Sequence, residues 1–157
     1  MIKFISLLPL VILAKKKKID YPNVSSHKRP SEIKEELYCE ACNGMVNVTL
    51  TKLYGSTKES DIFPVLENVC HYENYPLLEW RFRPPWMSDT CDAIMQDWEP
   101  KIEKYLINRN VNLSMKEHQE KICGNNSITR ACHNVDMPGF DRFMEMKKKL
   151  ESGNDEL

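Results

Sequence analysis

The sequence predicts an all-α domain, and three observations lead to that prediction. Glycine is scarce, with five residues in 157, whereas the good helix formers Lys, Glu, Leu and Met are plentiful. Apolar residues recur at helical spacing in several segments. Six cysteines, an even number, suit three disulfides in a small domain whose core alone would be marginal.

Residues 32–54 are expected to form the first helix. Ser31 precedes them as the expected N-cap. Gly44 and the β-branched residues after it lower the helix propensity and allow a bend there. Gly55-Ser56 should end the helix. Its apolar positions are Ile33, Leu37, Cys42, Val46, Leu50 and Leu53.

A second helix is expected over residues 58–72. Pro64 should mark either its first turn or a kink. Residues 73–87 should be irregular because they contain three prolines. The side chains expected to face inward from the second helix are Ile62, Phe63, Leu66, Val69 and Cys70.

The third helix is expected to begin near Ser88 or Asp89, which are both good caps, and to run to about residue 108. Pro100 lies inside it and should kink it. Its apolar positions are Cys91, Ile94, Met95, Trp98, Ile102, Tyr105 and Leu106.

Ser114 is predicted to cap a short fourth helix over 114–123. The Gly-Asn-Asn triplet at 124–126 should break that helix. A final helical piece is expected to carry Cys132, and Pro138-Gly139 should separate it from a helix in the tail.

The two ends of the chain carry signals for the secretory pathway. Residues 1–14 resemble a signal peptide, because Lys3 precedes an apolar run that is too short to span a bilayer, which needs about 20 residues. Residues 15–30 are expected to form a flexible basic arm. The last four residues, Asn154, Asp155, Glu156 and Leu157, form an x-Asp-Glu-Leu terminus. Such a terminus is read by the retrieval receptor, so we expect the protein in the lumen of the endoplasmic reticulum.

The charge and the polar residues point away from several functions. Without residues 1–14 the chain has one basic residue fewer, 21 against 23 acidic ones, and a net charge of −2. The sequence lacks the basic stripe with interleaved aromatic residues that would indicate nucleic-acid binding. There is no Gly-rich phosphate loop and no conspicuous Ser-His-Asp pattern, and the four histidines lack metal-ligand spacing. We therefore predict no catalytic residues, no metal and no cofactor.

The cysteines at 39, 42, 70, 91, 123 and 132 could pair in 15 ways. Cys39 and Cys42 are three residues apart on a predicted helix and therefore share a face. They also match Cys-x-x-Cys, which leaves a thiol-disulfide oxidoreductase as one alternative. Acidic helix precedes Cys39 and no strand leads into it, so structural bridging is favoured.

From about residue 32 to 143 the layout resembles a saposin-like domain. Leu37-Tyr38-Cys39-Glu40-Ala41-Cys42 and Thr129-Arg130-Ala131-Cys132 look like the opening and closing motifs of the canopy family, saposin-like proteins of the endoplasmic reticulum. The resemblance implies a bundle of four to five helices over residues 31–145, followed by a tail over 146–157. It also implies the disulfides Cys39–Cys132, Cys42–Cys123 and Cys70–Cys91.

The resemblance further implies a non-enzymatic, chaperone-like adaptor that assists folding or export of membrane or secreted client proteins. Besides its clients, such a protein would bind the retrieval receptor. The other alternative is a saposin-like protein that binds lipid or membrane. The Pro-rich middle and the near-neutral charge do not favour that reading.

The candidate partner surface is the segment Trp80-Arg81-Phe82-Arg83-Pro84-Pro85-Trp86. Trp and Arg are enriched at binding hot spots, and proline lowers the entropy lost on ordering. The alternative is that the tryptophans fill the core while the arginines are solvated. Four glycosylation sequons occur, at Asn23, Asn47, Asn112 and Asn125. Because Asn47 falls inside a predicted helix, glycosylation is expected at Asn112 and Asn125.

Overall fold

The computed structural model describes residues 29–77 and 79–135, and in those residues it is helical without a strand. This confirms the predicted all-α fold. The four α-helices and one 3₁₀ turn form a disulfide-stapled, saposin-like bundle. In chain order the elements are α1 (Glu35–Leu53), α2 (Glu59–Asn68), η1 (Tyr72–Asn74), α3 (Pro84–Asn108) and α4 (Met115–Cys123).

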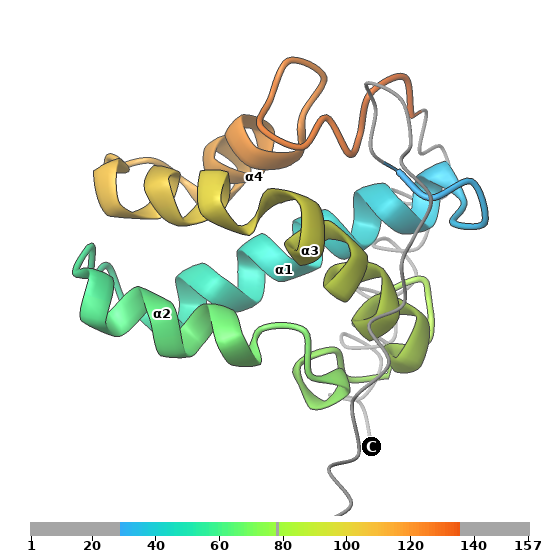
Figure 1. Cartoon of the computed structure of the whole chain (residues 1–157), viewed down its shortest axis with the longest axis horizontal. Helices are drawn as coiled ribbons and strands as arrows, with labels where there is room; N and C mark the ends of the chain where they lie inside the picture. The colour runs from blue at the N-terminus through green and yellow to red at the C-terminus, as the bar shows by residue number, and fades with distance from the viewer. Residues whose placement is uncertain (1–28, 78, 136–157) are drawn as a thin grey trace, which may run out of the picture.

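Helix α1 is the centre of the bundle. It packs against α2, α3 and α4, and in Figure 1 it runs between α2 and α4 with α3 across it. Eleven of its nineteen residues are buried, so apolar and small side chains cover most of its circumference. Because α1 is buried on several sides, it provides packing surface for α2, α3 and α4 together.

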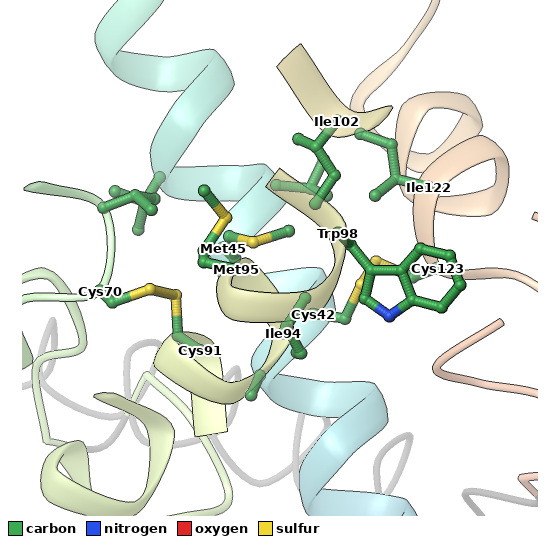
Figure 2. Packing of buried hydrophobic residues seen from close by; sticks show 14 of the residues in the cluster. Cys42, Met45, Cys70, Cys91, Ile94, Met95, Trp98, Ile102, Ile122 and Cys123 are labelled. Atoms are coloured by element: carbon green, nitrogen blue, oxygen red, sulfur yellow. A yellow bond between two sulfur atoms is a disulfide. The ribbon is translucent and has the colours of Figure 1, made fainter. Parts of the chain in front are cut away.

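The core lies where α1, α3 and α4 meet. Figure 2 shows Met45 of α1, Ile94 and Ile102 of α3, and Ile122 of α4 packed together. All four side chains are at most 1 % exposed. Two of the disulfides lie at opposite sides of this cluster in the same view, so the covalent links reinforce the apolar packing.

Three disulfides join the elements, and they are the three pairs that the resemblance implies. Two of them attach α1 to the end of the described chain: Cys39–Cys132 reaches the segment after α4, and Cys42–Cys123 reaches the last residue of α4. Cys70–Cys91 joins the segment after α2 to α3. No cysteine is left free. Three disulfides are typical of a protein of an oxidising compartment.

The boundaries of α1 differ from the expected ones at the start. The helix begins at Glu35, its N-cap is Lys34 without a side-chain cap, and the expected cap Ser31 lies outside. At the other end the prediction is correct. Tyr54 and Gly55 adopt φ values of 47° and 86°, and this left-handed pair ends the helix.

Helix α2 is shorter than expected, because it ends at Asn68 and a separate turn, η1, follows. Pro64 lies inside it. Ile62 and Leu66 face inward as predicted, but Phe63 is 52 % exposed, so the inward assignment of Phe63 is wrong. Ile62 and Leu66 are four residues apart and share the buried face, whereas Phe63 lies beside it.

Helix α3 begins four residues earlier than predicted. Pro84 and Pro85 are its first two residues, where a missing N–H costs nothing and the ring presets φ. Ser88 is therefore not a cap, and its hydroxyl donates to the Cys70 carbonyl at 2.5 Å. Pro100 lies inside the helix, and the ribbon of α3 changes direction midway in Figure 1.

Helix α4 has the predicted bounds. The Ser114 side chain accepts from the Glu117 N–H at 3.3 Å, and the Glu117 carboxylate accepts from the Ser114 N–H at 2.8 Å, which completes a capping box. The helix ends at Cys123, before the Gly-Asn-Asn triplet, as expected.

The segment that carries Cys132 is not helical, so that expectation is wrong. Arg130 and Asn134 have φ values of 52° and 56°, which break any helix there. The chain instead folds back, and the Thr129 and Cys132 N–H groups bond the carbonyls of Ile122 and Cys123 at 2.9 and 2.8 Å. These bonds satisfy carbonyls that the end of α4 leaves without helical partners. The expected leader, most of the basic arm, the tail helix and the retrieval signal lie outside the described residues.

Candidate functional site

The candidate segment 80–86 packs against α1 through the Trp80 ring. This ring meets the buried Tyr75 edge-on, with centroids 6.4 Å apart. Gly44 on α1 allows Tyr75 and Met87 to approach closely, because a Cβ at this position would lie 3.1 Å from atoms of both, whereas the Trp80 ring would be in ordinary contact at 3.5 Å. The glycine that suggested a bend in the sequence therefore has a packing reason.

Glu40 of α1 holds the backbone of the segment. Its side chain is 1 % exposed, and its Oε1 atom accepts the Arg81 N–H. Burial raises the pKa of the Glu40 carboxyl, while the Arg81 backbone N–H, the Arg81 charge and the Phe82 N–H lower it. A buried carboxylate with backbone donors anchors the segment from the side of α1.

The Cys70–Cys91 disulfide anchors the same segment from its other side. It closes a loop of 21 residues that contains η1 and the start of α3. The Ser88 hydroxyl bond to the Cys70 carbonyl lies at the base of this loop. The segment is thus held both by the covalent link and by Glu40.

The five candidate residues divide into two groups. Trp80 and Phe82 are half-buried and pack against the core. Arg81, Arg83 and Trp86 are exposed, and 54 % of the Trp86 side chain is accessible. Core packing therefore holds for Trp80 and Phe82, whereas a partner surface at Arg81, Arg83 and Trp86 stays a prediction.

Two exposed side chains in the same disulfide loop were not singled out from the sequence. Tyr72 is 59 % exposed and Leu77 is 70 % exposed. Their position between Cys70 and Cys91, in the same loop as the candidate residues, was the sequence feature that could have identified them. Glu40 was missed as well, because an acidic residue on a helix is usually solvated.

The Cys-x-x-Cys pair does not form a redox disulfide with itself. Cys39 and Cys42 belong to two different bridges and are 3 % and 0 % exposed. Within residues 29–77 and 79–135, no three His, Cys, Asp or Glu side chains gather as metal ligands would. His118 is buried, and its Nδ1 lies 2.6 Å from the Tyr105 hydroxyl. Burial, and then the Arg109 charge, lower the pKa of His118.

The described sequons differ in access. Asn112 and Asn125 are exposed, whereas Asn47 is half-buried on α1. The Asn125 side chain accepts the Asn134 N–H at 3.2 Å. Glycosylation at Asn112 and Asn125 stays a prediction, and Asn23 lies outside the described residues.

In the described part of the chain no helix has the length and apolar content needed to cross a membrane. Comparison of the chain with protein-family models, with curated proteins and with solved structures found no match.

Proposed function

We propose that this chain is a canopy-type, non-enzymatic, chaperone-like adaptor of the endoplasmic reticulum. It would assist the folding or export of membrane or secreted client proteins. The observation that carries the proposal is the exposed Trp86, next to the exposed Arg83 and Arg81, on a loop that a disulfide and a buried carboxylate hold in place.

The physical argument concerns the entropy of binding. A protein partner that meets a mobile loop must order it, at a cost of about 0.5–1.5 kcal/mol for each immobilised side chain. The Cys70–Cys91 link and the Glu40 contact meet part of this ordering cost in the free protein. The rings of Tyr72 and Trp86 and the side chain of Leu77 add apolar area in the same loop.

The location rests on the sequence. The leader at 1–14 and the x-Asp-Glu-Leu terminus support entry to the lumen and retrieval to it. Deleting residues 154–157 should send the protein into the medium of secreting cells. Equal retention with and without these residues would contradict this part of the proposal.

Client binding is tested with Trp86→Ala. The assay measures light scattering as a reduced, denatured secretory protein is diluted from denaturant in the presence of the chain. A hot-spot truncation costs about 2 kcal/mol or more, so the variant should act roughly 30-fold less well.

The matched control is Phe63→Ala on α2, since Phe63 is 52 % exposed and Trp86 is 54 % exposed. The control should act like the wild type. Equal activity of Trp86→Ala and wild type would contradict the proposed surface. If wild type binds vesicles and has no effect on the unfolded protein, the lipid alternative takes its place.

A further inference from the structure

The sequons at 112–114 and 125–127 each end in a serine whose hydroxyl makes hydrogen bonds in the folded chain. A sequon requires Ser or Thr at its third position, and the hydroxyl is the polar group that these two residue types share. The oligosaccharyltransferase that attaches the glycan must therefore read this hydroxyl together with the asparagine side chain. Whether the folded chain can present both groups depends on the bonds that they already make.

The sequon at 112–114 is held by hydrogen bonds to neighbours in the chain. The Ser114 hydroxyl donates to the Glu117 carboxylate at 2.8 Å and accepts the Glu117 N–H at 3.3 Å. The Asn112 N–H donates to the Asn110 side chain at 3.0 Å. Asn112 and Ser114 are both exposed. Because helix ends fray readily, opening the first turn of α4 frees this sequon while the rest of the bundle stays folded.

The sequon at 125–127 is held at both of its ends. Asn125 Oδ1 accepts the Asn134 N–H at 3.2 Å, and the Asn125 carbonyl accepts from the Arg130 guanidinium at 3.3 Å. The half-buried Ser127 hydroxyl donates to a carbonyl at the end of α4 at 2.8 Å and accepts the Arg130 N–H at 3.1 Å. Three of these bonds must break before the Asn125 side chain and the Ser127 hydroxyl are both free.

Two disulfides enclose the sequon at 125–127. It lies between Cys123 and Cys132, which are bridged to Cys42 and Cys39 of α1. Cys39 and Cys42 lie within one turn of each other on a buried helix, so both ends of the segment are fixed to the same place. In the oxidised chain the sequon must open inside a short closed loop. It therefore opens far less readily than a helix end.

A glycan that is already present on Asn125 is compatible with the fold. The Asn125 side chain is exposed, and its bond to the Asn134 N–H uses Oδ1, whereas the sugar is carried by Nδ2. The folded chain thus excludes the transferase from this sequon without excluding the glycan itself.

We propose that disulfide closure determines which asparagines of this chain receive a glycan. Asn125 is modified only before the two bridges to α1 form, whereas Asn112 is modified before or after. In the reaction the asparagine Nδ2 forms a bond to C1 of an oligosaccharide and loses one proton. The bond from C1 to the pyrophosphate of a lipid carrier breaks, and the lipid pyrophosphate leaves.

The test uses the whole chain, oxidised and free of glycans, from the periplasm of a bacterium that lacks such a transferase. Part of the sample is reduced and its thiols are blocked. Both forms are incubated with purified oligosaccharyltransferase and a lipid-linked oligosaccharide, and mass spectrometry measures the occupancy of each sequon. The oxidised chain should carry the glycan at Asn112, and the reduced chain at both sites. Because three hydrogen bonds must break, the occupancy ratio of Asn125 to Asn112 should rise at least about tenfold on reduction.

Two double variants separate local opening from a general loss of stability. Cys39→Ala/Cys132→Ala frees one end of the enclosed segment and should raise the modification of Asn125 in the otherwise oxidised chain. Cys70→Ala/Cys91→Ala removes a bridge elsewhere and should leave Asn125 unmodified as long as circular dichroism shows a folded chain. If either variant does not fold, the wild type in its oxidised and reduced forms decides the question.

Ser127→Ala assigns the glycan signal, because it removes the sequon and should abolish modification of Asn125 in the reduced chain. An equal ratio of the two sites in oxidised and reduced wild type would overturn the proposal. So would an oxidised chain in which Asn112 stays unmodified, or a reduced chain that is modified at neither site.

The inference rests on the proposed lumenal location only for its occurrence in cells. The purified reaction depends neither on that location nor on client binding. The expected glycan pattern, together with equal retention with and without residues 154–157, would refute the proposed location alone. Retention by residues 154–157, together with equal modification of Asn125 in both redox forms, would refute this inference alone.

Discussion

Removing one of the two long-range disulfides should cost less stability than its loop length suggests. Cys39–Cys132 spans 93 residues and Cys42–Cys123 spans 81, and the shorter loop lies inside the longer one. As an isolated link, a loop of 93 residues would contribute about 4.6 kcal/mol in the chain-entropy model. Either bridge alone, however, already brings α1 close to the end of α4.

The structure determines how much the second bridge can add to the free energy of unfolding. With Cys42–Cys123 intact, the outer bridge closes a loop made only of the residues between the two pairs, and the two separations, 93 and 81, differ by 12. A loop of 12 residues corresponds to about 2.8 kcal/mol. We therefore expect Cys39→Ala/Cys132→Ala to lower the free energy of unfolding by about 3 kcal/mol.

Urea unfolding of the whole chain, expressed through the secretory pathway, measures this cost for each bridge. Removal of the inner pair should also cost about 3 kcal/mol, and removal of both pairs about 7 kcal/mol, which is a large part of the about 5–15 kcal/mol by which native domains are stable. The reasoning is refuted if either single removal costs 4–5 kcal/mol, because the bridges would then act as independent loops. It also fails if the loss of both pairs costs no more than the loss of one.

Three further predictions concern single side chains. Ile94→Ala should cost about 2–5 kcal/mol because Ile94 is fully buried, whereas Ile107→Ala at the exposed end of the same helix should cost below about 1 kcal/mol. Equal costs in urea unfolding would contradict the packing. Burial lowers the pKa of His118 below 6.5, so its contribution to stability should be lost as the pH falls through the lowered pKa. His118→Gln should flatten this part of the profile, and an unchanged slope would count against it. Burial raises the pKa of Glu40 above 4.5, so its contribution should be lost as the pH rises through the raised pKa. Glu40→Gln should remove that slope in thermal unfolding, and a slope that persists would contradict the burial of the charge.

Helix α4 shows which features can be predicted from local sequence. Ser114 and Glu117 form the capping box within four residues of chain, and the Gly-Asn-Asn triplet follows Cys123 directly. Signal and structure lie in the same short segment, so no distant residue had to be known. The predicted bounds were therefore correct.

The start of α3 shows why other boundaries failed. Ser88 and Asp89 have the chemistry of caps, whereas none of the four residues directly before Pro84 has it. Ser88 donates instead to the carbonyl of Cys70, 18 residues away. A carbonyl that is distant in sequence thus determines which hydrogen bond the Ser88 side chain makes. The helix begins at a proline instead of behind a side-chain cap.

The candidate surface depends both on local sequence and on contacts between distant residues. The Trp, Arg and Pro content of the segment 80–86 identified it from the sequence alone. The tertiary structure decided that Trp80 and Phe82 face the core while Trp86 faces solvent. The contact that sets this orientation joins Glu40 to Arg81 over 41 residues, and no local pattern encodes it.

The sequence by itself determined the helical class, the number of cysteines, and those helix ends whose caps lie next to them. The residues alone left 15 cysteine pairings open, and the choice among them came from resemblance. Only the tertiary structure decided the burial of Glu40 and the close approach at Gly44. The physical reason is that propensity and capping act between neighbours in the chain. Burial and charge environment are set instead by residues that only folding brings together.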